Sequence, residues 1–181
     1  MPARAFQRRR LLRRGAYLLD RHFVRHKEQY LAQAALAAVA LAVVLAIEST
    51  LSHVAIVTAV ASSAVIIFTV PHSRQSAPRR VLGGHAVAIV VGLAVAAIIH
   101  EALGEPYEAT LPTGIAASIA VGASMLIMAA TDTEHPPAAG TVLGLTLAPD
   151  PLSSGLVVIL AAAALSAIRN LCRRWLIDLV H

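Results

Sequence analysis

Charged and aromatic side chains are scarce in this sequence of 181 residues. Charged residues make up 14% and aromatic residues 4%, whereas hydrophobic residues make up 57%. The mean hydropathy is +0.71. Because an average soluble domain carries roughly 25% charged residues, this composition excludes the ordinary soluble classes. It favours an all-α polytopic membrane protein, whose helices pack closely through small side chains such as Ala and Gly.

Cysteine is also nearly absent, since Cys172 is the only one in the chain. A single cysteine excludes a disulfide framework and a Cys-based zinc site within one chain. We therefore expect no metal and no cofactor. The N-terminus lacks a short apolar core followed by a small-residue cleavage site, so we also expect no removable signal peptide.

Basic residues concentrate in the segment of residues 1–30, where they alternate with apolar residues. This pattern predicts a basic interfacial or cytoplasmic segment that contacts anionic lipid headgroups. A basic stretch before an apolar one is more typical of a topology determinant than of a nucleic-acid arm. The expected partners are therefore membrane lipids, and no nucleic acid. The basic residues of this segment are Arg4, Arg8, Arg9, Arg10, Arg13, Arg14, Arg21, Arg25 and Lys27.

Five apolar stretches of 17 to 19 residues follow, at 31–47, 54–70, 81–99, 113–130 and 152–168. A helix rises about 1.5 Å per residue and the hydrocarbon core is about 30 Å thick, so each stretch predicts a long transmembrane helix. Residues 138–148 are apolar too, but as a helix they extend only about 16 Å. We therefore expect five long transmembrane helices plus a short half helix, within a transmembrane domain of residues 31–170 and a cytoplasmic tail of residues 171–181.

The basic residues outside the N-terminal segment set the expected topology. They are Arg74, Arg79, Arg80, Arg169, Arg173 and Arg174. Because cytoplasmic loops retain Lys and Arg, both termini should lie in the cytoplasm, on the inner side of the cell (inner) membrane. The chain must then cross outward between Asp132 and Asp150 with only the short stretch. We expect residues 131–137 to enter the membrane as non-helical chain, which is tolerated where it is buried in protein or lines a watery cavity.

The break in the apolar pattern at His135-Pro136-Pro137 is the first candidate site. Proline ends one helix and is favoured in the first turn of the next. The backbone amides at the start of the new helix should then lack partners at a positive helix end, which favours an anion. The four amides are those of Ala138, Ala139, Gly140 and Thr141. His135 can take up a proton, and Thr131, Thr133 and Thr141 add neutral donors.

A second break lies between the stretches at 54–70 and 81–99. It contains a proline with a histidine, then arginines, and restarts as Val-Leu-Gly, as the chain also does after His135. Two broken segments in corresponding places are typical of paired half-sites in transporters, although whether they form a true repeat stays open. The candidate residues of this second segment are His72, Ser73, Arg79, Gly83, Gly84 and His85.

Together, His135-Pro136-Pro137 with Thr141, Pro71-His72-Ser73, Pro78-Arg79 and Gly83-Gly84-His85 resemble the HPP family of integral membrane proteins over roughly residues 31–170. Members of that family are implicated in nitrite transport in cyanobacteria and plastids, so the resemblance implies passage of a small anion. This chain departs from the usual HPP-Ala-Gly-Ala, having Ala138-Ala139-Gly140 after its prolines, and it has Arg80 where Asn is common.

The leading hypothesis is a channel or secondary transporter, and not an enzyme, for a small monovalent inorganic anion that is nitrite-like. Its binding residues would be the candidates of the two broken segments together with Pro136, Pro137 and Ala138. Asp132 and Glu134 oppose a purely anion-selective lining, and one of them could shuttle a proton. Two alternatives remain open: an intramembrane metal site or enzyme built on His72, His85 and His135, and a non-transporting assembly factor. The abundance of small residues also predicts a homo-oligomer.

Overall fold

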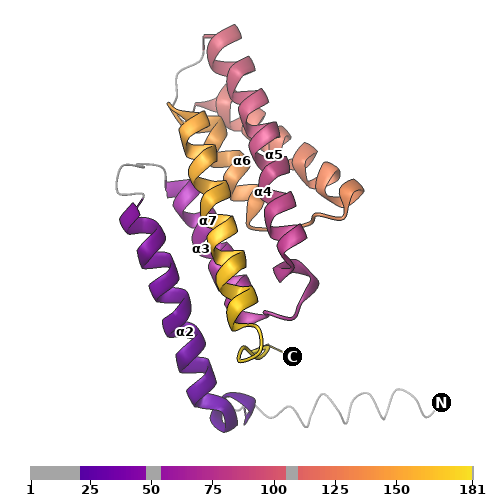
Figure 1. Cartoon of the computed structure of the whole chain (residues 1–181). Helices are drawn as coiled ribbons and strands as arrows, with labels where there is room; N and C mark the ends of the chain where they lie inside the picture. Colours follow the sequence, from indigo (N-terminus) through magenta and orange to yellow (C-terminus); the bar gives the residue numbers. More distant parts are fainter. Residues whose placement is uncertain (1–20, 48–53, 105–109, 181) are drawn as a thin grey trace, which may run out of the picture.

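The computed structural model describes residues 21–47, 54–104 and 110–180. In these residues the chain forms six α-helices and no strand (Figure 1), so the predicted all-α class is confirmed. Residues 1–20, 48–53, 105–109 and 181 lie outside the described part. The predicted interfacial role of the N-terminal basic segment therefore stays a prediction.

Each apolar stretch of the sequence is helical in the structure. The six helices are α2 (Arg21–Ile47), α3 (Val54–Thr69), α4 (Pro78–Ala96), α5 (Leu111–Thr131), α6 (Ala138–Leu147) and α7 (Pro151–Cys172). A 3₁₀ turn, Arg74–Ser76, precedes α4, and a π-helical turn, Ala97–Ala102, extends it. The short helix α6 has 10 residues and lies within the predicted short stretch 138–148.

Three helices of the described chain are long and apolar enough to cross a membrane: Pro78–Glu101, Leu111–Thr131 and Pro151–Cys172. Helices α3, with 16 residues, and α6 are apolar but shorter. The prediction of five long transmembrane helices is therefore more than the structure shows. At about 1.5 Å per residue, α3 extends about 24 Å, which is less than the hydrocarbon thickness of a typical bilayer.

Local sequence accounts for where the long helices begin. Pro78, Pro112 and Pro151 occupy the first turns of α4, α5 and α7, where a missing N–H costs nothing. Thr110 and Thr113 cap α5 reciprocally through side chain and backbone. The Asp150 carboxylate accepts from the Ser153 amide at 3.2 Å and caps α7.

Helix α6 lies in the middle of the bundle, where it packs against α3, α4, α5 and α7. Its buried side chains join two apolar clusters. Leu145 belongs to the cluster shared with α3, α4 and α7, whereas Ala138 and Val142 pack with Ala88 and Ala120. The outer faces of the helices expose large apolar side chains such as Val90 and Leu126, at 68% and 69%. Such exposure suits a lipid environment.

The C-terminal residues fold back against the connection between α3 and α4, close to the lower end of α7 in Figure 1. The Leu179 amide donates to the Thr69 carbonyl at 2.8 Å. His72 lies next to Asp178, with Nδ1 and Oδ1 3.5 Å apart. Arg169 donates through Nε to the Pro71 carbonyl at 2.9 Å. The predicted tail thus packs against the end of the bundle.

Candidate functional site

The segment between α5 and α6 is non-helical, as the sequence predicted. Helix α5 ends at Thr131, and the capping residue Asp132 adopts a left-handed conformation with φ 55°. Residues 133–135 have no regular structure, and the two prolines form a turn before α6 begins at Ala138. His135 is 1% exposed at the middle of this segment. The broken helix therefore carries an ionisable side chain into the protein interior.

Two buried histidines are joined through one serine hydroxyl. Ser63 of α3 places its Oγ 3.0 Å from Nε2 of His85 and 3.0 Å from Nε2 of His135. The two rings meet edge to face, with centroids 5.2 Å apart. Three elements that are distant in the sequence thus converge on a single hydroxyl, and we name His85, Ser63 and His135 the histidine network.

Each imidazole of the histidine network has a second polar partner on its other nitrogen. His85 Nδ1 lies 2.9 Å from Oγ1 of Thr141 on α6, and Thr141 is fully buried. His135 Nδ1 lies 3.1 Å from the backbone carbonyl of Gln75. Because unpaired polar groups in an apolar interior are costly, these contacts hold both rings in fixed orientations. Ionisable residues inside a membrane bundle are rare and mark functional sites by default.

Two consecutive glycines of α4 let the broken segment approach closely. A Cβ atom added at Gly84 would lie 2.7 Å from His135 Cβ and 2.9 Å from the Thr133 carbonyl. One added at Gly83 would lie 2.5 Å from a methyl carbon of Thr133. The glycine pair is therefore a packing requirement of the site, because any larger residue would displace the histidine segment.

Three arginines surround Asp132 at the point where α5 ends. Arg80 contacts Asp132 and places Nη1 2.7 Å from Oε2 of Glu134. Arg74 and Arg79 lie 3.5 and 3.7 Å from the Asp132 carboxylate. Only Arg80 is nearly enclosed, with 12% of its side chain exposed against 70% for Arg79. Three cations facing two carboxylates leave a positive local charge at this end of the bundle.

A cavity of about 230 Å³ opens beside His135, between α5 and the start of α6. Since one water molecule takes about 30 Å³ in the liquid, the cavity has room for a small ion with part of its hydration shell. Met125, 64% exposed, lies at its rim. The residues that line this α5–α6 cavity are Val121, Ser124, Met125, Met128, Glu134, His135, Pro136 and Ala139.

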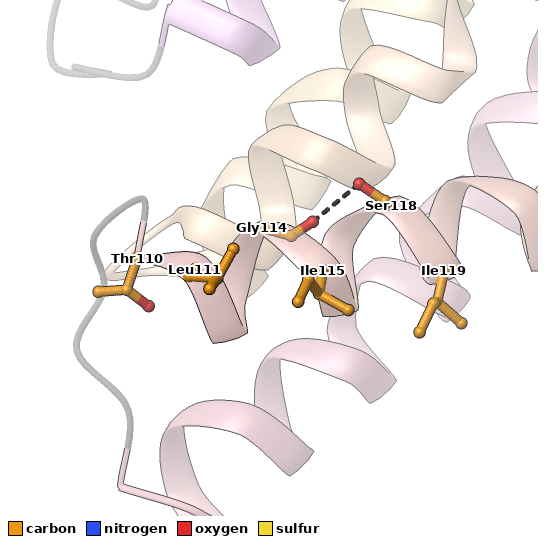
Figure 2. Close-up of a pocket in the computed structure, with 6 residues that line it drawn as sticks. All are labelled: Thr110, Leu111, Gly114, Ile115, Ser118 and Ile119. Carbon is orange, nitrogen blue, oxygen red and sulfur yellow. Dashed lines mark hydrogen bonds between the residues drawn. The ribbon is translucent and has the colours of Figure 1, made fainter.

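A second, wider hollow lies on the outer surface of α5 (Figure 2). Its lining comes from that helix alone, and Leu111, Ile115 and Ile119 project side by side along it. The Ser118 hydroxyl donates to the Gly114 carbonyl at 2.8 Å, which satisfies the one polar side chain at its centre. This surface contains no titratable group, so it offers nothing that would hold an ion.

The hydrogen bonds of the backbone amides at the start of α6 differ from the prediction. The Ala138, Ala139 and Gly140 amides donate to the carbonyls of His135, Pro136 and Pro137 at 2.9, 3.1 and 3.1 Å. The prediction that these amides lack partners is therefore wrong. The turn formed by the two prolines directs its own carbonyls at them, so the recognition groups of the site are side chains.

The structure brings together nine of the thirteen residues predicted from sequence. His85, His135 and Thr141 form one connected set, with Gly83, Gly84 and Thr133 packed beside them. Pro137 and Ala138 are buried behind His135, and Pro136 lines the cavity. The remaining candidates lie apart from the histidine network. They are Thr131, which bonds Thr133; Ser73, which bonds Ser76; Arg79, which bonds the Thr131 carbonyl; and His72.

The position of His72 bears on the alternative of a three-histidine metal site. His72 is 40% exposed and pairs with Asp178, whereas His85 and His135 are buried. Among the residues that the structure describes, no group of three or more His, Cys, Asp or Glu side chains is arranged to hold a metal ion. His72 therefore does not converge with His85 and His135, as that alternative would require.

Sequence reasoning missed Ser63 and assigned Arg80 only an anchoring role. Ser63 lies within the apolar stretch 54–70, beside Ser62, and a buried hydroxyl in such a stretch is a signal that could have been followed. Arg80 could not be told from Arg79 by sequence, because only the packing shows which side chain is enclosed. Ser124 and Met128 of the cavity lining carry no sequence signal.

Comparison with known proteins shows the family of the chain. Residues 24–178 match the family described as the HPP transmembrane region. The chain belongs to the HPP family of membrane proteins. The match extends beyond the predicted limits of 31–170 at both ends, so the family region includes all but the first three residues of α2 and most of the C-terminal residues that pack on the bundle.

A transmembrane protein of Dictyostelium discoideum is also similar to this HPP-family chain. It is 38% identical over 85 residues, which cover 46% of this chain and 27% of the relative. The chain therefore matches only about a quarter of that relative's length. No solved structure matches.

Proposed function

We propose that this HPP-family protein transports a small monovalent anion, nitrite-like in size and charge, through the α5–α6 cavity beside His135. The observation that carries the proposal is a buried, fully partnered histidine on the wall of a cavity of about 230 Å³. A membrane protein does not keep ionisable side chains inside its bundle without use, because burying them is costly.

Local charge supports an anion over a cation. The three arginines beside Asp132 exceed the two carboxylates of the segment, and Arg80 neutralises Glu134, which also lines the cavity. A positive entrance raises the local concentration of anions through long-range attraction. The selectivity therefore belongs to the entrance and to His135, and not to the amides of α6.

The proposal includes an orientation in the cell (inner) membrane. The ends of α3 and α7 lie together, beside Arg74, Arg169 and Arg174. Because basic loops stay in the cytoplasm, we place this end, with both chain termini, in the cytoplasm. Helices α2 and α3 then complete five crossings together with the three long helices. A homo-oligomer stays a prediction.

Nitrite flux into proteoliposomes tests the proposal. We expect His135→Gln to lower the flux at least tenfold, because the cavity loses its only histidine. His100→Gln is the matched control, since His100 is also buried but bonds the Thr146 carbonyl away from the cavity. Equal flux through both variants would contradict the assignment of the site.

Filling the cavity provides a test that leaves His135 in place. Ala139 lines the cavity, so Ala139→Leu should block the flux. Ala123 is exposed on α5 and is not part of the lining, so Ala123→Leu should transport like the parent. Unchanged flux through a folded Ala139→Leu protein would show that the anion takes another path.

A further inference from the structure

The hydrogen bonds of the histidine network determine where its protons lie in the neutral state. A backbone carbonyl can only accept, so Nδ1 of His135 must carry a proton and donate it to Gln75. Nε2 of a neutral His135 is then an acceptor, and it receives the Ser63 hydroxyl proton. The Gln75 carbonyl thus determines which atoms donate and which accept at the His135 end of the network.

The same reasoning continues through Ser63 to α6. A hydroxyl has one proton to donate, and Ser63 Oγ lies near two acceptors, the Ala59 carbonyl and Nε2 of His135. The Ala59 carbonyl also accepts a backbone amide of its own helix, whereas Nε2 of His135 has Ser63 as its donor, so in the neutral state Ser63 gives its proton to His135. His85 must therefore donate from Nε2 to Ser63, which leaves its Nδ1 to accept from the Thr141 hydroxyl. In the neutral state the two histidines are opposite tautomers, and every hydrogen bond from Thr141 to Gln75 points the same way.

We propose that Ser63 relays a proton between His85 and His135, and that this relay supplies the positive charge that holds an anion in the α5–α6 cavity. The network would then couple each anion to one proton. The part that concerns the anion rests on the proposed function, whereas the relay rests on the hydrogen-bond order alone.

The transfer moves two protons, each across one hydrogen bond. A proton that originates from water resides on Nδ1 of His85, and the Thr141 hydroxyl turns to accept from it. His85 then gives its Nε2 proton to Ser63 Oγ, while Ser63 gives its own proton to Nε2 of His135. His85 ends neutral and His135 ends cationic, with no other bond changed. The Ala59 carbonyl, 2.9 Å from Ser63 Oγ, offers the hydroxyl a second acceptor for the return.

The surroundings explain why the proton and the anion should arrive together. The charged and titratable groups near the network, among the described residues, are Asp132, Glu134, Arg74, Arg79 and Arg80, and their contacts pair them with one another. Among the described residues, the side chains that helices α3, α5 and α6 present to the network and the cavity are uncharged: they are Ser63, Val121, Ser124, Met125, Met128, Ala139 and Thr141. A lone cationic imidazole is costly in such an interior, whereas an anion beside His135 offsets that charge.

The test measures protons and nitrite together in proteoliposomes that contain a pH-sensitive dye. With equal starting pH on both sides and an inward nitrite gradient, we expect the parent to carry one proton with each nitrite. Protein-free liposomes give the background from nitrous acid crossing the lipid. Ser63→Ala should lower the proton-coupled flux at least tenfold, whereas Ser62→Ala should not, since Ser62 bonds only the Thr58 carbonyl of its own helix.

The outcomes separate the relay from the proposed function. Nitrite flux in the parent without protons, or equal proton-coupled flux in Ser63→Ala and Ser62→Ala, would overturn the relay and leave the transport proposal standing. Absence of nitrite flux in the parent would overturn the proposed function, and the relay would then be judged by its tautomers.

Nitrogen NMR of the full chain in lipid nanodiscs, labelled with ¹⁵N-histidine, reads those tautomers directly. At neutral pH we expect His85 to be protonated at Nε2 and His135 at Nδ1, with the signals assigned through His85→Gln and His135→Gln. The same tautomer on both rings would overturn the relay, because Ser63 could not then donate to one ring while accepting from the other.

Discussion

At the scale of single residues, the site depends on which side chains the packing encloses. Sequence predicted His85, His135 and Thr141, because histidines and threonines beside broken apolar stretches are unusual enough to be noticed. Ser63 was not predicted, since many helical serines simply bond a backbone carbonyl of their own helix, as Ser62 does. The partners of the α6 amides could not be predicted either, because the conformation of the two-proline turn determines them.

Gly84 should tolerate no side chain. In Gly84→Ala the new methyl group would meet the His135 segment at 2.7 Å, and such overpacking typically costs about 1–3 kcal/mol. Gly122→Ala is the control, because a Cβ there meets nothing within 4 Å. Thermal unfolding in detergent should show a lower midpoint for Gly84→Ala than for Gly122→Ala. A Gly84→Ala protein as stable as the control would mean that the segment packs elsewhere.

Replacing Arg80 should lower the free energy of unfolding more than replacing Arg79, although the two are adjacent in sequence. Arg80→Gln removes the cation that contacts Glu134. Breaking a buried pair costs about 3–5 kcal/mol, and because Glu134 is 44% exposed we expect about 1–2 kcal/mol after screening by solvent. Arg79→Gln, on a side chain 70% exposed, should change the free energy of unfolding by less than about 0.5 kcal/mol. Equal losses in chemical denaturation would contradict this difference.

At the scale of elements, the lengths of the apolar stretches predicted the positions of the helices well. They predicted less well how many helices are long enough to cross a membrane. The stretches at 54–70, 113–130 and 138–148 became α3, α5 and α6 within two residues at each end. Length alone could not show that α6 packs against four other helices. Nor could it show that the last residues fold back onto the end of α3, because those contacts join positions far apart in the chain.

Gln33 should fasten α2 to the bundle. Its Nε2 donates to the Phe68 carbonyl and, at 2.9 Å, to the Ile177 carbonyl, while its Oε1 accepts from the Ile177 amide. Gln33→Leu leaves the Phe68 carbonyl and the part-buried Ile177 backbone groups without this partner. An unsatisfied buried group costs about 1–3 kcal/mol, and the part-buried ones cost less. Limited proteolysis should release α2 from this variant faster than from Gln29→Leu, whose parent side chain is exposed. Identical cleavage rates would show that apolar packing alone holds α2.

At the scale of the whole molecule, the charges and the fold together determine how the protein sits in its membrane. Three long helices and the shorter α3 pack around α6 in one bundle. The basic residues near Asp132 lie at the end of the bundle where α3 and α7 finish. The broken segment enters from this same end, which places the site within reach of the basic side.

Labelling of single cysteines tests that orientation. With Cys172 replaced by serine, a cysteine at position 74 and one at 174 should react from the same side of the membrane. A cysteine at position 150, at the start of α7, should react from the other side, because α7 is long enough to cross. Positions 74 and 174 on opposite sides would contradict the proposed topology.

The central claim, that a small anion binds beside His135, is tested most directly by anomalous diffraction from crystals of the protein grown with bromide. Bromide is a monovalent anion that the α5–α6 cavity can hold, and its position is visible without any assumption about transport. We predict a peak between Ser124, His135 and Ala139 that disappears in Ala139→Leu. Peaks found only at exposed arginines, with the cavity empty, would contradict the account.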